Sequence, residues 1–202
     1  MWYNRLSEFL LERGYVNNED SPFVFIRKSQ NGFYIILVYV NDMNIIGHII
    51  GHTKDIEEAS AYLKAEFEMK DMGKTRFCLG LQIEYLPEGI LIHQSTYTRK
   101  VLERFNILKA HPVTTPMVVR SLDKDKDPFR PKGENEELLG PEVPYLSAIG
   151  ALMYLVNCTR PDIAFAVNLL ARYSAAPTRR HWVGVQTILR YLRALLILVY
   201  FS

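Results

Sequence analysis

The sequence predicts an α+β protein, with antiparallel β-hairpins backed by helices in its first half and helices alone near its C-terminus. Runs rich in aromatic and β-branched residues occur as neighbouring pairs early in the chain, as β-hairpins require. Apolar residues recur at helical spacing between these pairs and again after residue 144. At 202 residues, of which 49% are hydrophobic, the chain is long enough to bury a substantial core.

A helix is predicted first. Within residues 2–13, Leu6, Phe9 and Leu10 recur at helical spacing. Gly14 follows them, and glycine commonly ends a helix because it adopts the left-handed conformation without strain.

Three strands are predicted next. The runs 22–28 and 33–40 are separated by Ser-Gln-Asn-Gly, which suits a tight turn with positive φ. A third apolar run, 43–50, follows Asn41-Asp42. Three successive strands joined by short connections form an antiparallel meander.

A helix, a second hairpin and another helix follow. Residues 54–69 carry one apolar stripe and are predicted to be helical. The runs 75–86 and 89–94 flank Pro87-Glu88 and are predicted to pair as a hairpin. Residues 95–108 then return to helical periodicity.

Residues 109–143 are predicted to be a linker. Six of the ten prolines lie between residues 112 and 144, together with the charged run Asp-Lys-Asp-Lys-Asp. Such a composition disfavours helices and strands and is typical of exposed, irregular chain.

The remaining residues, 144–202, are predicted to be helical throughout. Thr159 and Asp162 have the spacing of a capping box, and Thr178 is placed to cap a further helix. The three predicted helices comprise residues 144–157, 159–174 and 177–193.

The net charge is only +2, but it is unevenly distributed. From Arg160 to Ser202 there are six arginines and one acid, Asp162, whereas the rest of the chain carries 18 basic and 21 acidic residues. A solvated helix face is one explanation. Contact with a phosphate backbone is the other.

Targeting signals are not evident. No apolar run approaches the roughly 20 residues that span a bilayer, and the first residues lack the cationic-then-apolar layout of a secretion signal. We therefore expect an intracellular protein, in the cytoplasm, nucleus or an organelle, that is not secreted and has no membrane partner. Cys78 and Cys158 lie in apolar segments and are expected to be reduced core thiols.

The pair Asn41-Asp42 has two interpretations. Asn and Asp are turn residues, and two apolar strands need a turn between them. Carboxylates at a hairpin tip can also hold divalent cations that bind the attacking and leaving oxygens in phosphoryl transfer. In that case Tyr39-Val40-Asn41-Asp42 is a metal site in which an amide replaces one carboxylate.

Five segments, in the same order, resemble the reverse transcriptase of copia-type LTR retrotransposons, which forms part of a Pol polyprotein. "LVYVNDMNIIG" resembles the YVDD hairpin of that family, and "FEMKDMGKTRFCLGLQIEY" resembles its F-x-M-K-D-L-G … F-L-G-I-E-I segment. "GILIHQSTYTRKVLERFNI", "TTPM" and residues 144–193 resemble the stretches that follow in the family.

The resemblance implies a partial polymerase palm with an RNA-directed DNA polymerase (nucleotidyltransferase) site. Asp42 would be the second active-site acid and a ligand of Mg²⁺ or Mn²⁺. Asn41 would be the degenerate first position, while Tyr39, Val40 and Met43 would complete the hairpin.

The resemblance also implies contacts with an RNA–DNA template–primer duplex. Leu79, Gly80 and Gln82 would belong to the hairpin that grips the primer. The arginines expected to face phosphates are Arg172, Arg179, Arg180, Arg190 and Arg193.

The implied domains are a partial palm with the primer-grip hairpin and the start of a thumb (1–108), the linker (109–143), and a thumb and connection segment before RNase H (144–202). Compared with the family, the sequence starts after another catalytic aspartate and stops before the RNase H aspartates. An amide at Asn41 should slow catalysis by roughly two to four orders of magnitude. We therefore expect no polymerisation by this fragment alone, and binding of deoxynucleotides only in an intact enzyme with the rest of Pol.

Two further hypotheses stay open. The arginine-rich end could be a non-catalytic nucleic-acid-binding remnant, with Tyr173, Trp182 and Tyr191 nearby. Alternatively, the chain is a decayed reading frame whose product has no function.

Overall fold

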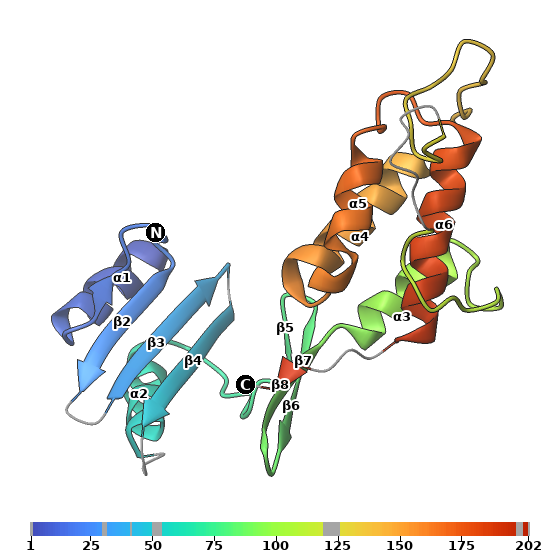
Figure 1. Ribbon diagram of the computed structural model, residues 1–202. Helices are drawn as coiled ribbons and strands as arrows, with labels where there is room; N and C mark the ends of the chain where they lie inside the picture. Colours follow the sequence, from blue (N-terminus) through green and yellow to red (C-terminus); the bar gives the residue numbers. More distant parts are fainter. Residues whose placement is uncertain are drawn as a thin grey trace. The chain divides into compact units, whose positions relative to one another are not determined.

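The computed structural model describes residues 2–29, 32–40, 42–49, 54–118, 126–196 and 200–201. The chain forms two compact units, Met1–Thr75 and Arg76–Ser202 (Figure 1). Both contain helices and antiparallel sheet, so the predicted α+β class is confirmed. No helix in the described part of the chain has the length and apolar character needed to cross a membrane.

The first unit is a four-stranded antiparallel sheet with two helices on one face. The sheet order is β1-β2-β3-β4, which confirms the predicted meander and adds the two-residue strand β1. Its elements are α1 (Trp2–Glu12), β1 (Val16–Asn17), β2 (Val24–Ser29), β3 (Gly32–Tyr39), β4 (Asp42–Ile49) and α2 (Lys54–Glu66).

The core of this unit follows from residue alternation in β3. Tyr34, Ile36 and Val38 are buried on the same face of the strand, because successive side chains point to opposite faces. The predicted apolar stripe of α1 and the residues Leu63 and Phe67 pack against that face. Both helices therefore cover one side of the sheet and leave the other side open within this unit.

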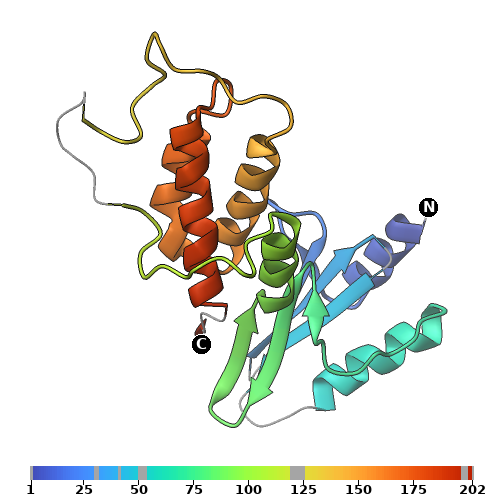
Figure 2. The same cartoon turned by 90° about the vertical axis from the view of Figure 1, so that its right-hand side faces the viewer.

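The second unit combines a small antiparallel sheet with helices (Figure 2). The predicted hairpin across Pro87-Glu88 is confirmed, and β8 pairs with β7, so the prediction that everything after residue 144 is helical is wrong. The elements are β5 (Phe77–Cys78), β6 (Leu81–Leu86), β7 (Gly89–His93), α3 (Ser95–Arg104), α4 (Tyr145–Cys158), the 3-10 helix η1 (Pro161–Ile163), α5 (Ala164–Ala171), α6 (Arg179–Ala194) and β8 (Tyr200–Phe201).

In its described residues, 109–118 and 126–143, the predicted linker is irregular, but its second part packs against the helices. Phe129 is only 4% exposed and belongs to the core formed by α3, α4, α5 and α6. Leu138 forms a β-bridge with Thr178, and the Leu139 N–H donates to the Pro177 carbonyl at 2.9 Å. The compact unit thus starts at Arg76, because the helix after the second hairpin shares its core with the C-terminal helices.

Two local predictions near α4 are wrong. The Thr159 hydroxyl donates to the Gln94 side-chain oxygen at 2.7 Å, and Asp162 binds Arg160, so these residues form no capping box. Cys158, the last residue of α4, is exposed rather than a core thiol. Thr178 does precede α6, as predicted, and its N–H donates to His181 Nδ1 at 3.0 Å.

Candidate functional site

The first candidate site is the tip of the β3–β4 hairpin. Tyr39 pairs with Asp42 across the end of the ladder, and Val40 is in the turn between them. Asn41 itself lies outside the described residues. Val40 has a φ of 52°, a left-handed conformation that is rare for a β-branched residue and occurs mainly at functional turns.

Strand β3, with Tyr34, Ile36 and Val38 buried, carries this tip into solvent. Tyr39 is 56% exposed and Val40 is 72% exposed, and the Asp42 side chain is exposed as well. Met43 turns the other way and packs against the core of the first unit. The hairpin therefore presents one carboxylate, an aromatic ring and an apolar side chain on a rigid base.

One carboxylate does not fit a two-metal centre by itself. Among the described residues there is no group of three or more His, Cys, Asp or Glu side chains that could hold a metal ion. Carboxylate-bound Mg²⁺ sites in phosphoryl-transfer enzymes are completed by substrate phosphates and by further ligands. Asp42 can thus supply one ligand, and the other charges have to come from elsewhere.

The second candidate site is the turn between β5 and β6. Cys78 pairs with Leu81, so Leu79 and Gly80 form a two-residue turn, with φ values of 49° and 78°. Leu79 is 55% exposed, and Phe77 beside it is 67% exposed. Phe77 was not among the residues predicted from the sequence, although an apolar residue next to a Leu-Gly turn is a signal that could have indicated it.

Gln82, predicted to contact the primer, has partners within the chain. Its side-chain oxygen accepts a hydrogen bond from the Ser95 hydroxyl at 3.0 Å and another from the Thr96 N–H at 2.7 Å. This oxygen therefore satisfies the Thr96 N–H in the first turn of α3. A contact between Gln82 and the primer stays a prediction. Only the N–H donors of the Gln82 side-chain amide could make this contact without breaking these two hydrogen bonds.

Three of the five arginines predicted to contact phosphates bind the irregular chain, and their phosphate contacts stay a prediction. Arg180 contacts both carboxylate oxygens of Glu136 and donates to the Pro128 carbonyl at 2.9 Å. Arg190 donates to the His111 carbonyl at 2.6 Å, and Arg193 donates to the Ala110 carbonyl.

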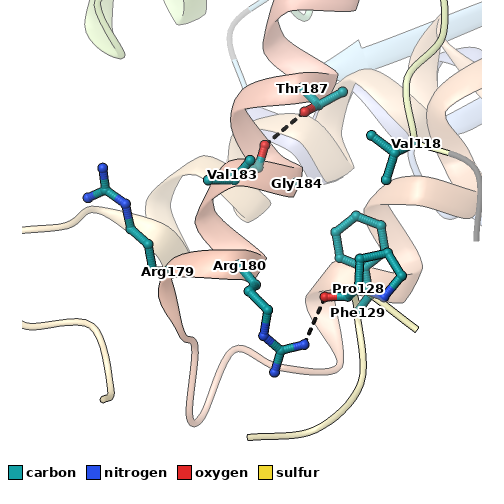
Figure 3. Close-up of a pocket in the computed structure, with 8 residues that line it drawn as sticks. All are labelled: Val118, Pro128, Phe129, Arg179, Arg180, Val183, Gly184 and Thr187. Atoms are coloured by element: carbon teal, nitrogen blue, oxygen red, sulfur yellow. Dashed lines mark hydrogen bonds between the residues drawn. The ribbon is translucent and has the colours of Figure 1, made fainter. Parts of the chain in front are cut away.

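Arg172 and Arg179 are the exposed members of this predicted group. Figure 3 shows the difference between neighbours: Arg180 turns toward Pro128, while Arg179 points away from both of them. Hydrogen bonds from Arg180, followed by one from the Gly133 N–H, lower the pKa of Glu136 to about 2. The Arg180 charge is thus compensated, and the guanidinium of Arg179 projects into solvent.

A small apolar hollow lies beside these arginines, with a volume of about 230 Å³ (Figure 3). Gly184 is at its wall, where an added Cβ would lie 2.6 Å from the Phe129 ring. The hollow therefore depends on the absence of a side chain at position 184. Its lining residues are Val118, Pro128, Phe129, Arg179, Arg180, Val183, Gly184 and Thr187.

Comparison with known proteins decides the family. A family model described as "Reverse transcriptase (RNA-dependent DNA polymerase)" matches residues 1–119, which include both candidate turns. The chain belongs to the reverse transcriptase family. The predicted resemblance to the copia-type Pol reverse transcriptase is thereby confirmed.

Relatives of this reverse transcriptase segment are Pol polyproteins of plant transposons. It is 38% identical over 196 residues to the retrovirus-related Pol polyprotein from transposon TNT 1-94 of Nicotiana tabacum. The aligned residues make up 95% of this chain and 14% of that protein. It is 33% identical over 194 residues to the corresponding polyprotein from transposon RE2 of Arabidopsis thaliana, covering 95% and 12%. The segment thus spans less than one sixth of these relatives. No solved structure matches it.

Proposed function

We propose that this chain is a segment of the RNA-directed DNA polymerase of a retrotransposon Pol polyprotein, and that it holds an RNA–DNA template–primer duplex. The observation that carries the proposal is the β3–β4 hairpin, whose tip exposes Tyr39, Val40 and Asp42 to solvent. The first unit is then part of the palm. The second unit carries the primer-grip hairpin and the thumb and connection helices.

In this proposal Asp42 is a ligand of Mg²⁺ or Mn²⁺ once other parts of a polymerase supply the remaining carboxylates and the deoxynucleotide. The Asn41 amide brings no negative charge, so the tip attracts a cation with one carboxylate only. Polymerisation by this chain in isolation is therefore not expected.

Cation binding at the tip is tested with Mn²⁺, followed by electron paramagnetic resonance. Asn41→Asp should tighten Mn²⁺ binding about tenfold, because a second carboxylate roughly doubles the attracting charge. Asp42→Asn should remove the binding, and Asp20→Asn, at an exposed loop position of the same unit, is the matched control. Equal Mn²⁺ affinity in the wild type and both hairpin variants would contradict the metal role.

Duplex binding is tested by fluorescence anisotropy of a labelled RNA–DNA primer–template. Phosphate interactions release counterions, so binding should weaken as salt is raised. Charge reversal at the exposed Arg172 and Arg179 should lower the salt dependence by about one ion for each arginine that binds a phosphate. Lys70→Glu makes the same change of charge at an exposed position in the other unit and should leave binding unchanged.

A second function, a non-catalytic nucleic-acid-binding remnant, rests on the same exposed arginines. It predicts duplex binding that survives Asp42→Asn and Asn41→Asp alike. The absence of binding by a folded sample would instead favour a decayed reading frame without function.

A further inference from the structure

The Leu79–Gly80 turn contains a residue in an unfavourable backbone conformation. Two-residue hairpin turns with positive φ at both central positions favour Asn-Gly, Asp-Gly or Gly-Gly. Here the first position is leucine, with a φ of 49°. A bulky residue stays in this region only where neighbouring groups hold it there.

Tyr154, on α4, is the neighbour that contacts this turn. Its hydroxyl donates a hydrogen bond to the Leu79 carbonyl, 75 positions away in the sequence. The β5–β6 turn and α4 lie side by side in Figure 1. A Cβ added at Gly80 would lie 2.6 Å from the Tyr154 hydroxyl oxygen, so the approach of this hydroxyl requires glycine at position 80.

The Tyr154 ring is itself fixed by the helices. Tyr97, on α3, packs edge-on against it with ring centroids 4.9 Å apart. Burial raises the pKa of Tyr154, as does its neighbour Cys158, so the hydroxyl stays protonated and remains a donor at neutral pH. The contact therefore joins the turn to two helices of the same unit.

We propose that Tyr154 is a positioning residue for the β5–β6 turn. Its hydroxyl holds Leu79 in the left-handed conformation and so orients the exposed side chains of Phe77 and Leu79. This part of the proposal rests on the proposed function: the two side chains contact the primer strand of an RNA–DNA duplex. Helices α3 and α4 thus set the conformation of the β5–β6 turn, although neither helix contains residues of that turn.

Hydrogen exchange measures the positioning role without any nucleic acid. Tyr154→Phe keeps the ring and its contact with Tyr97 but removes the donor, so amides of residues 78–82 should exchange about fivefold faster, as expected for losing one hydrogen bond. Tyr97→Phe removes a hydroxyl from the other ring of the pair and should leave these amides unchanged. Unchanged exchange in Tyr154→Phe would overturn the proposal.

Leu79→Asn provides a second variant on the opposite side of the contact. Asn tolerates the left-handed conformation and creates the preferred Asn-Gly turn. In this background, Tyr154→Phe should accelerate exchange less than it does with leucine at position 79. An equal acceleration in both backgrounds would show that Tyr154 does not act through the conformation of Leu79.

Affinity for the duplex tests the second part of the proposal, namely that the β5–β6 turn contacts the primer strand. Tyr154→Phe should weaken binding of the RNA–DNA primer–template by about fivefold, whereas Tyr97→Phe should not. Faster exchange with unchanged affinity would overturn the role of the turn in gripping the primer. A wild-type chain that binds no duplex would contradict the proposed function, while the exchange data would still decide whether Tyr154 positions Leu79.

Discussion

The side-chain oxygen of Gln82 lies 2.7 Å from the backbone nitrogen of Thr96, so a residue of the β6–β7 hairpin caps the helix that follows it. Gln94, at the N-cap of α3, makes no side-chain cap of its own. The Thr96 N–H of the first helical turn is thus satisfied by a residue distant in sequence, while the Ser95 N–H donates to the nearby His93 Nδ1 at 3.3 Å.

Removing this cap should destabilise the second unit. Gln82→Ala is expected to lower the free energy of unfolding by about 1 kcal/mol, the usual loss when a capping acceptor is removed. Gln82→Glu keeps an acceptor and adds a charge that the helix N-terminus favours, so it should retain the wild-type value. Urea denaturation of the three proteins measures the difference, and equal stabilities for Ala and Gln would refute the capping role.

Two helical glycines should respond in opposite directions to alanine. Gly184→Ala should destabilise the chain by about 1–2 kcal/mol, because the new Cβ would lie 2.6 Å from Phe129 and 3.1 Å from Leu170. Gly150→Ala meets nothing within 4 Å and should stabilise by about 0.5–1 kcal/mol through helix propensity. Thermal unfolding of both variants provides the measurement, and a stabilised Gly184→Ala would show that Phe129 is not packed there.

Attachment of the irregular segment to α6 through Glu136 should depend on pH. The pKa of Glu136 is lowered in the folded chain, from 4.5 to about 2, by Arg180 and then by the Gly133 N–H. A lowered folded pKa means that its stabilising contribution is complete above pH 4.5 and is lost as the pH falls toward 2. Melting temperatures between about pH 5 and pH 2 should therefore fall more steeply for the wild type than for Glu136→Gln. Parallel curves would contradict this linkage.

Asp162 should be harder to replace than its exposure suggests. Arg160 is only 3% exposed and donates to both carboxylate oxygens of Asp162, at 2.9 and 2.7 Å. Burial opposes ionisation of Asp162, but the hydrogen bonds and charge of Arg160 outweigh it and lower the pKa.

Asp162→Asn leaves a buried guanidinium without its counter-charge and should cost about 3 kcal/mol. Arg160→Met, which removes the buried charge, should cost less than Asp162→Asn. Chemical denaturation of both variants ranks them. The reverse order would show that the hydrogen bond from Arg160 to the Leu195 carbonyl, at 2.8 Å, matters more than the ion pair.

Local patterns were enough to predict the elements whose partners are close in sequence. The alternation in β3 and the apolar stripe of α1 each predict a face, and the structure buries that face. The tip at Tyr39 and Asp42 was predicted in the same way, since strand ends can be read from neighbouring residues. The family followed from the order of several such segments.

Long-range contacts could not be predicted in this way. Phe129 lies among prolines and charges, so an averaged composition hides an aromatic residue that enters the core. The bonds of Gln82 and Tyr154 join residues that no local periodicity connects. The arginine bias was explained by a solvated helix face or a phosphate surface, yet Arg180 in the first turn of α6, and Arg190 and Arg193 in its last turns, bind carbonyls within the chain.

The way α6 holds the irregular chain bears on how that chain can evolve. Arg180, Arg190 and Arg193 bind main-chain carbonyls, which every amino acid provides. Side chains beside those carbonyls can drift without loss of the attachment, so mutations should accumulate there far more freely than in the arginines. Phe129 and Glu136 are the exceptions, because Phe129 anchors the loop through its ring and Glu136 through the carboxylate that binds Arg180. In this part of the protein, selection should act on a few residues of a helix, one aromatic ring and one carboxylate, and leave most other residues of the loop nearly neutral.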